Sequence, residues 1–237
     1  MSIFLLILSV AIGGVIPFFW KTSEVNFKHA LTFSASYLLC VTLFHLFPEL
    51  FEEAEEQSVS TLLIGGLLIA GFLFQKVLEF FSGGVEHGHI HQHHKITPHI
   101  LLIALCIHAL LEGTVLTSTS SHHHHSSHLL FGIVLHKIPA AFALTSILLH
   151  EKITIKKTVI YLAIFSMASP LGLILSKLLV AQMSEKYTIY LFAIVTGNLL
   201  HITTTIFFES SIEHRLSKTR WLVVLLGIVL ALGVEFL

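Results

Sequence analysis

Residues 128–149, HLLFGIVLHKIPAAFALTSILL, form an apolar run whose one formally charged residue is Lys137. A helix needs about 20 mostly apolar residues to cross the hydrocarbon core of a bilayer, so this run is long enough to span it. Pro139 removes a backbone hydrogen bond and opens the preceding turn near His136. Such a break is tolerated in a membrane where the backbone lines a cavity. The run therefore predicts a transmembrane helix that faces a polar interior.

Seven more runs of this kind occur in the chain. The eight predicted spans are residues 2–20, 29–50, 60–81, 98–118, 128–149, 156–179, 187–208 and 220–236. Hydrophobic residues make up 54 % of the 237 residues and charged residues 11 %, against about 25 % charged in an ordinary soluble domain. The alternating ten-residue segments of a membrane barrel are absent from the sequence. We predict an all-α polytopic membrane protein with a single transmembrane domain over residues 1–237.

The distribution of loop cations predicts the orientation. With the N-terminus outside, ten of the 13 Lys and Arg residues fall on the cytoplasmic side: Lys21, Lys28, Lys76, Lys95, Lys152, Lys156, Lys157, Arg215, Lys218 and Arg220. Only Lys177 and Lys186 fall on the opposite side. Cytoplasmic loops carry the excess of Lys and Arg in membrane proteins, so both termini are expected outside. The acidic residues of the segment 52–56 then also lie outside.

Two predicted loops are rich in histidine, of which the chain has 18. Residues 86–97 join the third and fourth spans on the cytoplasmic side, and residues 119–128 join the fourth and fifth spans outside. Short histidine tracts commonly bind metal ions, because neutral imidazole is a frequent ligand. We predict weak, exchangeable metal contacts there; solvated polar loops without a ligand are the alternative.

Ionisable residues at membrane depth are candidates for function because each is costly to bury. His108 and Glu112 are four residues apart, so they share one face of the fourth span. At about 1.5 Å per residue, Glu112 lies roughly 9 Å, His136 roughly 12 Å and His108 roughly 15 Å below the outer surface. Two imidazoles and one carboxylate at nearly one level suit zinc first, and iron(II) or manganese next. A hydrogen-bonded structural group is the alternative.

These residues resemble the ZIP (Zrt/Irt-like protein) family of divalent-metal transporters over nearly the whole chain. The matching motifs are His108 to Gly113 (HALLEG), His136 to Pro139 (HKIP), His45 to Glu49 (HLFPE), Ser169 to Gly172 (SPLG), and Gly197 to Leu199 with Glu209. The resemblance implies an eight-helix fold with both ends outside, a metal path between the fourth and fifth helices, and import toward the cytoplasm.

The chain departs from the family at a second metal position. Many members hold two adjacent ions, and the ligands of the second correspond here to Ala109, Lys137 with Ala140, and Ser169. A subgroup of the family shares the His-Lys-x-Pro-Ala-Ala pattern. We expect a single site of His108, Glu112 and His136, in which the Lys137 ammonium replaces the second cation and partly neutralises Glu112. The alternative is that Lys137 extends to the interface or pairs elsewhere.

Further polar residues predict secondary sites on a path. His45 and Glu49 share a face near the outer end of the second span, where an arriving ion could lose water; a helix-end hydrogen bond is the alternative. His201 and Glu209 share a face of the seventh span, as exit ligands or as bundle hydrogen bonds. Asn198 is expected to form hydrogen bonds between helices rather than to bind the ion. Glycines 13, 14, 65, 66 and 71 are expected to permit close helix approach or bending.

The predicted function is import of a divalent metal ion, zinc first and Fe²⁺, Mn²⁺ or Cd²⁺ as alternatives, by alternating access through one His/Glu site. The sequence has no phosphate loop, so ion gradients rather than ATP are expected to drive transport. An intramembrane zinc hydrolase and a metal sensor are the rival interpretations; the hydrolase needs a further acid or serine near the metal. The expected partners are the ion, the bilayer of the plasma membrane and, as one alternative, a second copy of the chain. The net charge of −1 gives no reason to expect nucleic acid.

Overall fold

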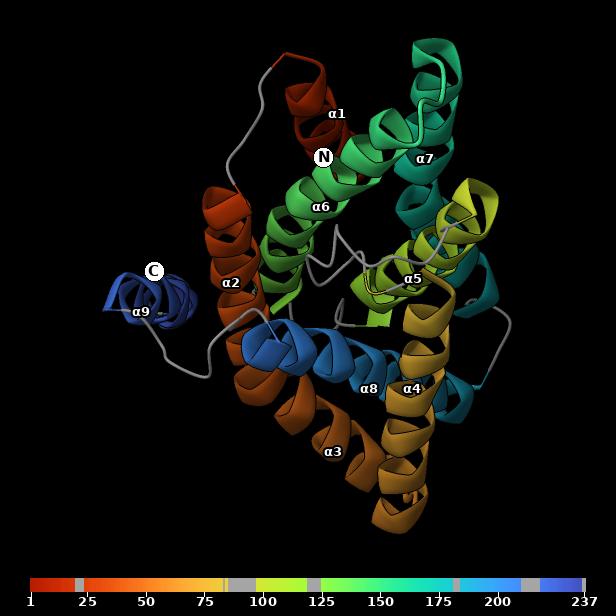
Figure 1. Ribbon diagram of the computed structural model, residues 1–237. Helices are drawn as coiled ribbons and strands as arrows, with labels where there is room; N and C mark the ends of the chain where they lie inside the picture. The colour runs from red at the N-terminus through yellow and green to blue at the C-terminus, as the bar shows by residue number, and fades with distance from the viewer. Residues whose placement is uncertain are drawn as a thin grey trace.

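The computed structural model describes residues 1–19, 24–82, 84, 97–118, 125–180, 184–209 and 218–235, and all the regular elements in these ranges are helices (Figure 1). In chain order they are α1 (Ser2–Phe19), α2 (Glu24–Val41), the π-helical turn η1 (Thr42–Leu46), α3 (Phe47–Glu56), α4 (Thr61–Ser82), α5 (Pro98–Ser118), α6 (His125–His150), α7 (Ile155–Val180), α8 (Glu185–Glu209) and α9 (Lys218–Glu235). The predicted all-α architecture is confirmed.

Within the described ranges, seven helices are long and apolar enough to cross a membrane. They include α2, η1 and α3 together as one span, Val25–Glu56. The eighth predicted span corresponds to α9, whose 18 residues contain Lys218, Arg220 and Glu235. Helix α9 lies at the edge of the molecule, where it packs mainly on α2 (Figure 1). The chain is therefore a polytopic helical membrane protein, while the side on which its termini lie stays a prediction.

The second span is longer than the predicted range 29–50 and contains a π-helical turn. Pro48 lacks the N–H that an α-helix would use at this point. The backbone instead widens to η1, where the Phe47 N–H donates to the Thr42 carbonyl oxygen. The helix then continues as α3 to Glu56, so the acidic residues expected after the span lie on its last turns. The π turn carries His45, and such turns occur frequently at functional sites.

The most extensive helix contacts pair α5 with α7, α4 with α8, α1 with α6, and α2 with α9. Glycine permits the closest of these approaches. A Cβ atom added at Gly113 on α5 would lie 2.1 Å from the Ser169 carbonyl oxygen on α7, and one at Gly71 on α4 would lie 1.9 Å from the Ile194 carbonyl oxygen on α8. These backbones therefore touch directly, as small residues allow in membranes.

The glycine prediction holds in part. An added Cβ atom at Gly13 would lie 2.1 Å from the Ile138 carbonyl oxygen, which brings α1 close to α6. Close approach, the first of the two expectations, is wrong at Gly65 and Gly66, where no described atom of a neighbouring element lies within 4 Å of such a Cβ. The N-terminal half of α4 therefore has no close partner at these positions among the described residues.

Candidate metal site

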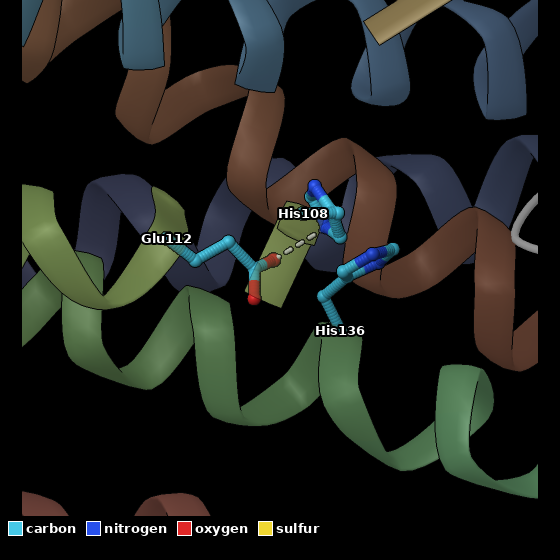
Figure 2. A group of neighbouring side chains, drawn as sticks. All are labelled: His108, Glu112 and His136. Atoms are coloured by element: carbon cyan, nitrogen blue, oxygen red, sulfur yellow. Dashed lines mark ion pairs between the residues drawn. The ribbon is translucent and has the colours of Figure 1, made fainter. Parts of the chain in front are cut away.

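The three residues expected to share an ion converge between α5 and α6. Helix α5 supplies His108 and Glu112 from successive turns, and α6 supplies His136 (Figure 2). One ligand atom of each residue lies within 4.8 Å of those of the other two. The side chains are buried, with only 1 to 2 % of each residue exposed. The His108 and His136 rings stand nearly perpendicular, with their centroids 5.9 Å apart.

The Glu112 carboxylate has a different neighbour at each oxygen. Its Oε1 lies 3.0 Å from His108 Nε2, the contact drawn dashed in Figure 2, and its Oε2 lies 2.9 Å from Lys137 Nζ. Lys137 is itself only 2 % exposed, and its Nζ stands 5.1 Å from the centroid of the Phe165 ring. That ring face attracts the ammonium group. The buried lysine therefore contacts a different oxygen of Glu112 from the one that His108 contacts.

The local sequence explains why these side chains meet. Lys137 follows His136 directly, so α6 presents both at one level, and Pro139 lies inside the same helix. Gly113 follows Glu112 and lets α7 approach α5 closely. Across this crossing the Ser169 hydroxyl donates to the Ala109 carbonyl oxygen at 2.5 Å. Ser169 and Ala109, two of the second-site positions, thus hold α5 against α7.

The donor set is suited to a borderline metal ion. Imidazole nitrogen and carboxylate oxygen are ligands of zinc and of other first-row divalent ions. With three protein ligands, a fourth coordination position stays open for water. An open position is typical of sites where a metal-bound molecule exchanges, whereas structural sites have four protein ligands. Within the described residues the group contains a single carboxylate, Glu112. It lacks the second acid that a zinc hydrolase would use for proton transfer.

The predicted pair His45 and Glu49 lies outside this group and has a different neighbour. The His45 ring stacks on the ring of His128 from α6, with centroids 5.4 Å apart and planes 8° apart. Glu49 is 8 % exposed, and neither of its carboxylate oxygens has a hydrogen-bond partner among the described residues. His128 was expected at the end of a loop, whereas α6 already begins at His125.

His201 pairs with a residue that the sequence did not indicate. Its Nε2 lies 2.7 Å from the Glu79 Oε2 of α4, and the Phe72 ring packs edge-on against it at 4.6 Å. Glu209 ends α8, but its side chain lies outside the described residues. The expected partnership of His201 with Glu209 therefore stays a prediction, and Glu79 is the observed partner.

Gln75 and Glu79 are the polar residues of this region that the sequence did not indicate, whereas Asn198 was expected to form hydrogen bonds between helices, as it does with Gln75. Gln75 and Glu79 are four residues apart in the apolar run of α4 and are buried, as Asn198 is on α8. The signal was present, because polar residues inside a span are functional candidates by default. Lys76, which lies between Gln75 and Glu79 in the sequence, entered the sequence analysis only as a cation of the predicted cytoplasmic side. Most of the histidine-rich segments, residues 86–96 and 119–124, lie outside the described residues.

The fold and the cluster define a class of protein: a polytopic helical membrane protein with a buried His/Glu group between two spans. The family profile described as ZIP Zinc transporter matches residues 86–235. Because this match covers more than half of the chain, the chain belongs to the ZIP zinc transporter family. The members of this family are transporters, not enzymes.

One curated relative is the protein zntD of Dictyostelium discoideum. It is 29 % identical to this chain in an alignment of 162 residues, which covers 62 % of this chain and 24 % of zntD. The chain thus spans about a quarter of that relative's length. The matched residues of the family profile include all three members of the buried cluster.

Proposed function

We propose that this protein imports a divalent metal ion, zinc first, by alternating access through one site formed by His108, Glu112 and His136. The observation that carries the proposal is the convergence of their ligand atoms within 4.8 Å at buried positions. Membership of the ZIP zinc transporter family supports a metal ion as the substrate. Fe²⁺, Mn²⁺ and Cd²⁺ are the other candidates, because the same donor types accept them.

Lys137 makes this a site for one ion. Its ammonium group 2.9 Å from Glu112 Oε2 balances the carboxylate when no metal is bound. A divalent ion that arrives at Oε1 therefore adds its full charge to a neutral environment, which opposes tight retention in a low-dielectric interior. We infer that Lys137 takes the place of a second metal ion. The His-Lys-x-Pro-Ala-Ala sequence of α6 supports a place in the family's subgroup with this pattern.

A path through the protein is proposed from the other buried pairs. His45 and Glu49, near the outer end of the second span, would receive the ion, helped by the acidic end of α3. On the inner side, His201 with Glu79 would accept it after release, and Glu209 extends α8 beyond them. Import toward the cytoplasm, termini on the outside, the plasma membrane and a homodimer belong to the same proposal. The distribution of Lys and Arg supports the position of the termini.

The test measures zinc flux into proteoliposomes that contain the full chain. His108→Ala, Glu112→Ala and His136→Ala should each reduce flux to the level of empty liposomes. His99→Ala is the matched control: it removes an imidazole from the same helix, where the ring contacts the Tyr161 hydroxyl instead of the cluster. This variant should transport like the wild type.

Zinc binding to the detergent-solubilised protein is measured beside the flux, by competition with a chromophoric chelator. Loss of both binding and flux in the three cluster variants, with His99→Ala unaffected, is the expected result. Wild-type flux from all three cluster variants would refute the proposed site. Binding without flux in the wild type would favour a sensor, and lipid or peptide cleavage would favour an enzyme.

A further inference from the structure

A chain of hydrogen bonds reaches His108 from the pair of helices on its other side. Gln75 on α4 and Asn198 on α8 are both fully buried. The Asn198 side-chain N–H donates to Gln75 Oε1 at 2.8 Å, and Asn198 Oδ1 lies 3.2 Å from His108 Nδ1. The chain thus joins α4, α8 and α5 at the level of the candidate metal site.

The order of donors along this chain fixes the protonation of the imidazole. An amide group donates only from its nitrogen and accepts only at its oxygen. Since Asn198 already directs its nitrogen to Gln75, it presents an oxygen to His108, and Nδ1 must carry the hydrogen. The neutral ring then has its lone pair on Nε2. Nε2 is the atom that lies 3.0 Å from Glu112 Oε1.

This arrangement leaves two electron-pair donors facing each other across the cluster. The His108 Nε2 lone pair and the Glu112 Oε1 atom are favourable neighbours at 3.0 Å only with a positive charge between them, either a proton or a metal ion. The hydrogen bond that His108 Nδ1–H donates to Asn198 Oδ1 therefore leaves Nε2, the nitrogen beside Glu112, to bind a metal ion. This step rests on the proposed function, since it presumes that the cluster binds the transported ion.

The helices that carry the two amides are held together at close range. A Cβ atom at Gly197, next to Asn198, would lie 2.0 Å from the Leu68 carbonyl oxygen of α4, and one at Gly71 would lie 1.9 Å from the Ile194 carbonyl oxygen of α8. Direct backbone contact at these two glycines restricts sliding between α4 and α8. The amide of Asn198 therefore meets His108 from a fixed position.

We propose that Asn198, oriented by Gln75, is a positioning residue that selects the His108 tautomer whose Nε2 binds the transported metal ion. Partners of this kind hold the non-ligating nitrogen of a metal-bound histidine, and their loss typically lowers metal affinity about 10- to 100-fold. From the sequence, Asn198 was expected only to form hydrogen bonds between helices. A purely structural contact would affect stability without selecting a nitrogen of His108.

The experiment compares Asn198→Leu, Asn198→Asp and Gln75→Leu in the full chain purified in detergent. Thr196→Val is the matched control, since Thr196 is fully buried on α8 and its hydroxyl has no hydrogen-bond partner among the described residues. Zinc affinity is measured by chelator competition. The coordinating nitrogen of His108 is identified in ¹⁵N-histidine-labelled protein loaded with ¹¹³Cd²⁺, from the cadmium coupling that is lost in His108→Gln.

Asn198→Leu should weaken zinc binding about 10- to 100-fold and abolish the coupling at Nε2 or divide it between both nitrogens. Gln75→Leu should act in the same direction with a smaller effect. Asn198→Asp, which still offers an oxygen to Nδ1, should retain the Nε2 coupling, and Thr196→Val should match the wild type. If Asn198→Leu does not fold, Asn198→Asp and Gln75→Leu still decide the matter.

Unchanged affinity and Nε2 coupling in Asn198→Leu would overturn the inference, as would loss of that coupling in Asn198→Asp. His108→Gln in the same titration separates this inference from the proposed function. If His108→Gln binds zinc like the wild type, the proposed site itself is wrong. If His108→Gln loses binding and Asn198→Leu does not, only the role of Asn198 is refuted.

Discussion

Removal of one partner of the buried Glu112–Lys137 pair should destabilise the protein strongly. The atoms Oε2 and Nζ are 2.9 Å apart, and unit charges at this distance attract by about 6 kcal/mol at an effective dielectric constant of about 20. Both residues are at most 2 % exposed, so neither charge can turn to water when its partner is lost. Breaking a buried pair typically lowers the free energy of unfolding by about 3–5 kcal/mol. We expect this loss for Lys137→Met and for Glu112→Gln.

The double variant should be less destabilised than either single variant. Replacement of both partners removes the two charges together, and a buried ion pair exchanged for neutral groups is often nearly neutral in stability. The coupling free energy from this double-mutant cycle should therefore exceed about 3 kcal/mol, at the upper end for residues in contact. The free energy of unfolding is measured by titration of the detergent-solubilised protein with sodium dodecyl sulfate, followed by circular dichroism.

Lys76→Met provides the control for a lost lysine charge. Lys76 also pairs with a glutamate, Glu79, at 3.1 Å, but its side chain is 57 % exposed. The exposed Lys76 ammonium is solvated with or without its partner, and Glu79 keeps its contact with His201, so this variant should unfold nearly like the wild type. Additive effects of Glu112→Gln and Lys137→Met would refute the reasoning, since they would mean that the two charges do not depend on each other.

Two further predictions concern the inner path and the packing of the helices. Glu79→Gln should leave the zinc affinity of the cluster unchanged and slow zinc flux, because Glu79 contacts His201 rather than the cluster; wild-type flux in this variant would remove the pair from the path. Gly113→Ala should lower the free energy of unfolding by about 1–3 kcal/mol, because the added Cβ atom would lie 2.1 Å from a carbonyl oxygen of α7. Gly65→Ala is the control: no described atom lies within 4 Å of the added Cβ atom, so the free energy of unfolding should change by less than about 0.5 kcal/mol. Equal effects of Gly113→Ala and Gly65→Ala in the same titration would contradict the packing argument.

The sequence predicted the spans and the convergence of His108, Glu112 and His136 because both depend on local periodicity. A bilayer requires long apolar runs with helical hydrogen bonding, so hydropathy alone locates the helices. His108 and Glu112 share a face through their i,i+4 spacing, and the short connection between the spans brings His136 to the same level. The pairing of Lys137 with Glu112, stated as a hypothesis from the departure at the family's second metal position, is the contact observed at 2.9 Å.

Hydropathy and helical spacing could not predict the contacts between helices that are distant in the sequence. Glu79 lies 122 positions from His201, and Gln75 lies 123 positions from Asn198. Their meeting depends on the rotation and depth at which α4 and α8 pack, and these follow from backbone contact at glycines. The sequence shows such glycines without showing which of them touch a neighbour: Gly71 does, whereas Gly65 and Gly66 face open space.

The sequence by itself determined a helical membrane protein with two imidazoles and a carboxylate at one depth, because hydropathy and helical spacing act within single segments. Only the tertiary structure decided that Glu112 faces His108 and Lys137 with different oxygens, and that Asn198 meets the other nitrogen of His108. The physical reason is that the direction of a side chain around a helix has meaning only once the neighbouring helices are in place.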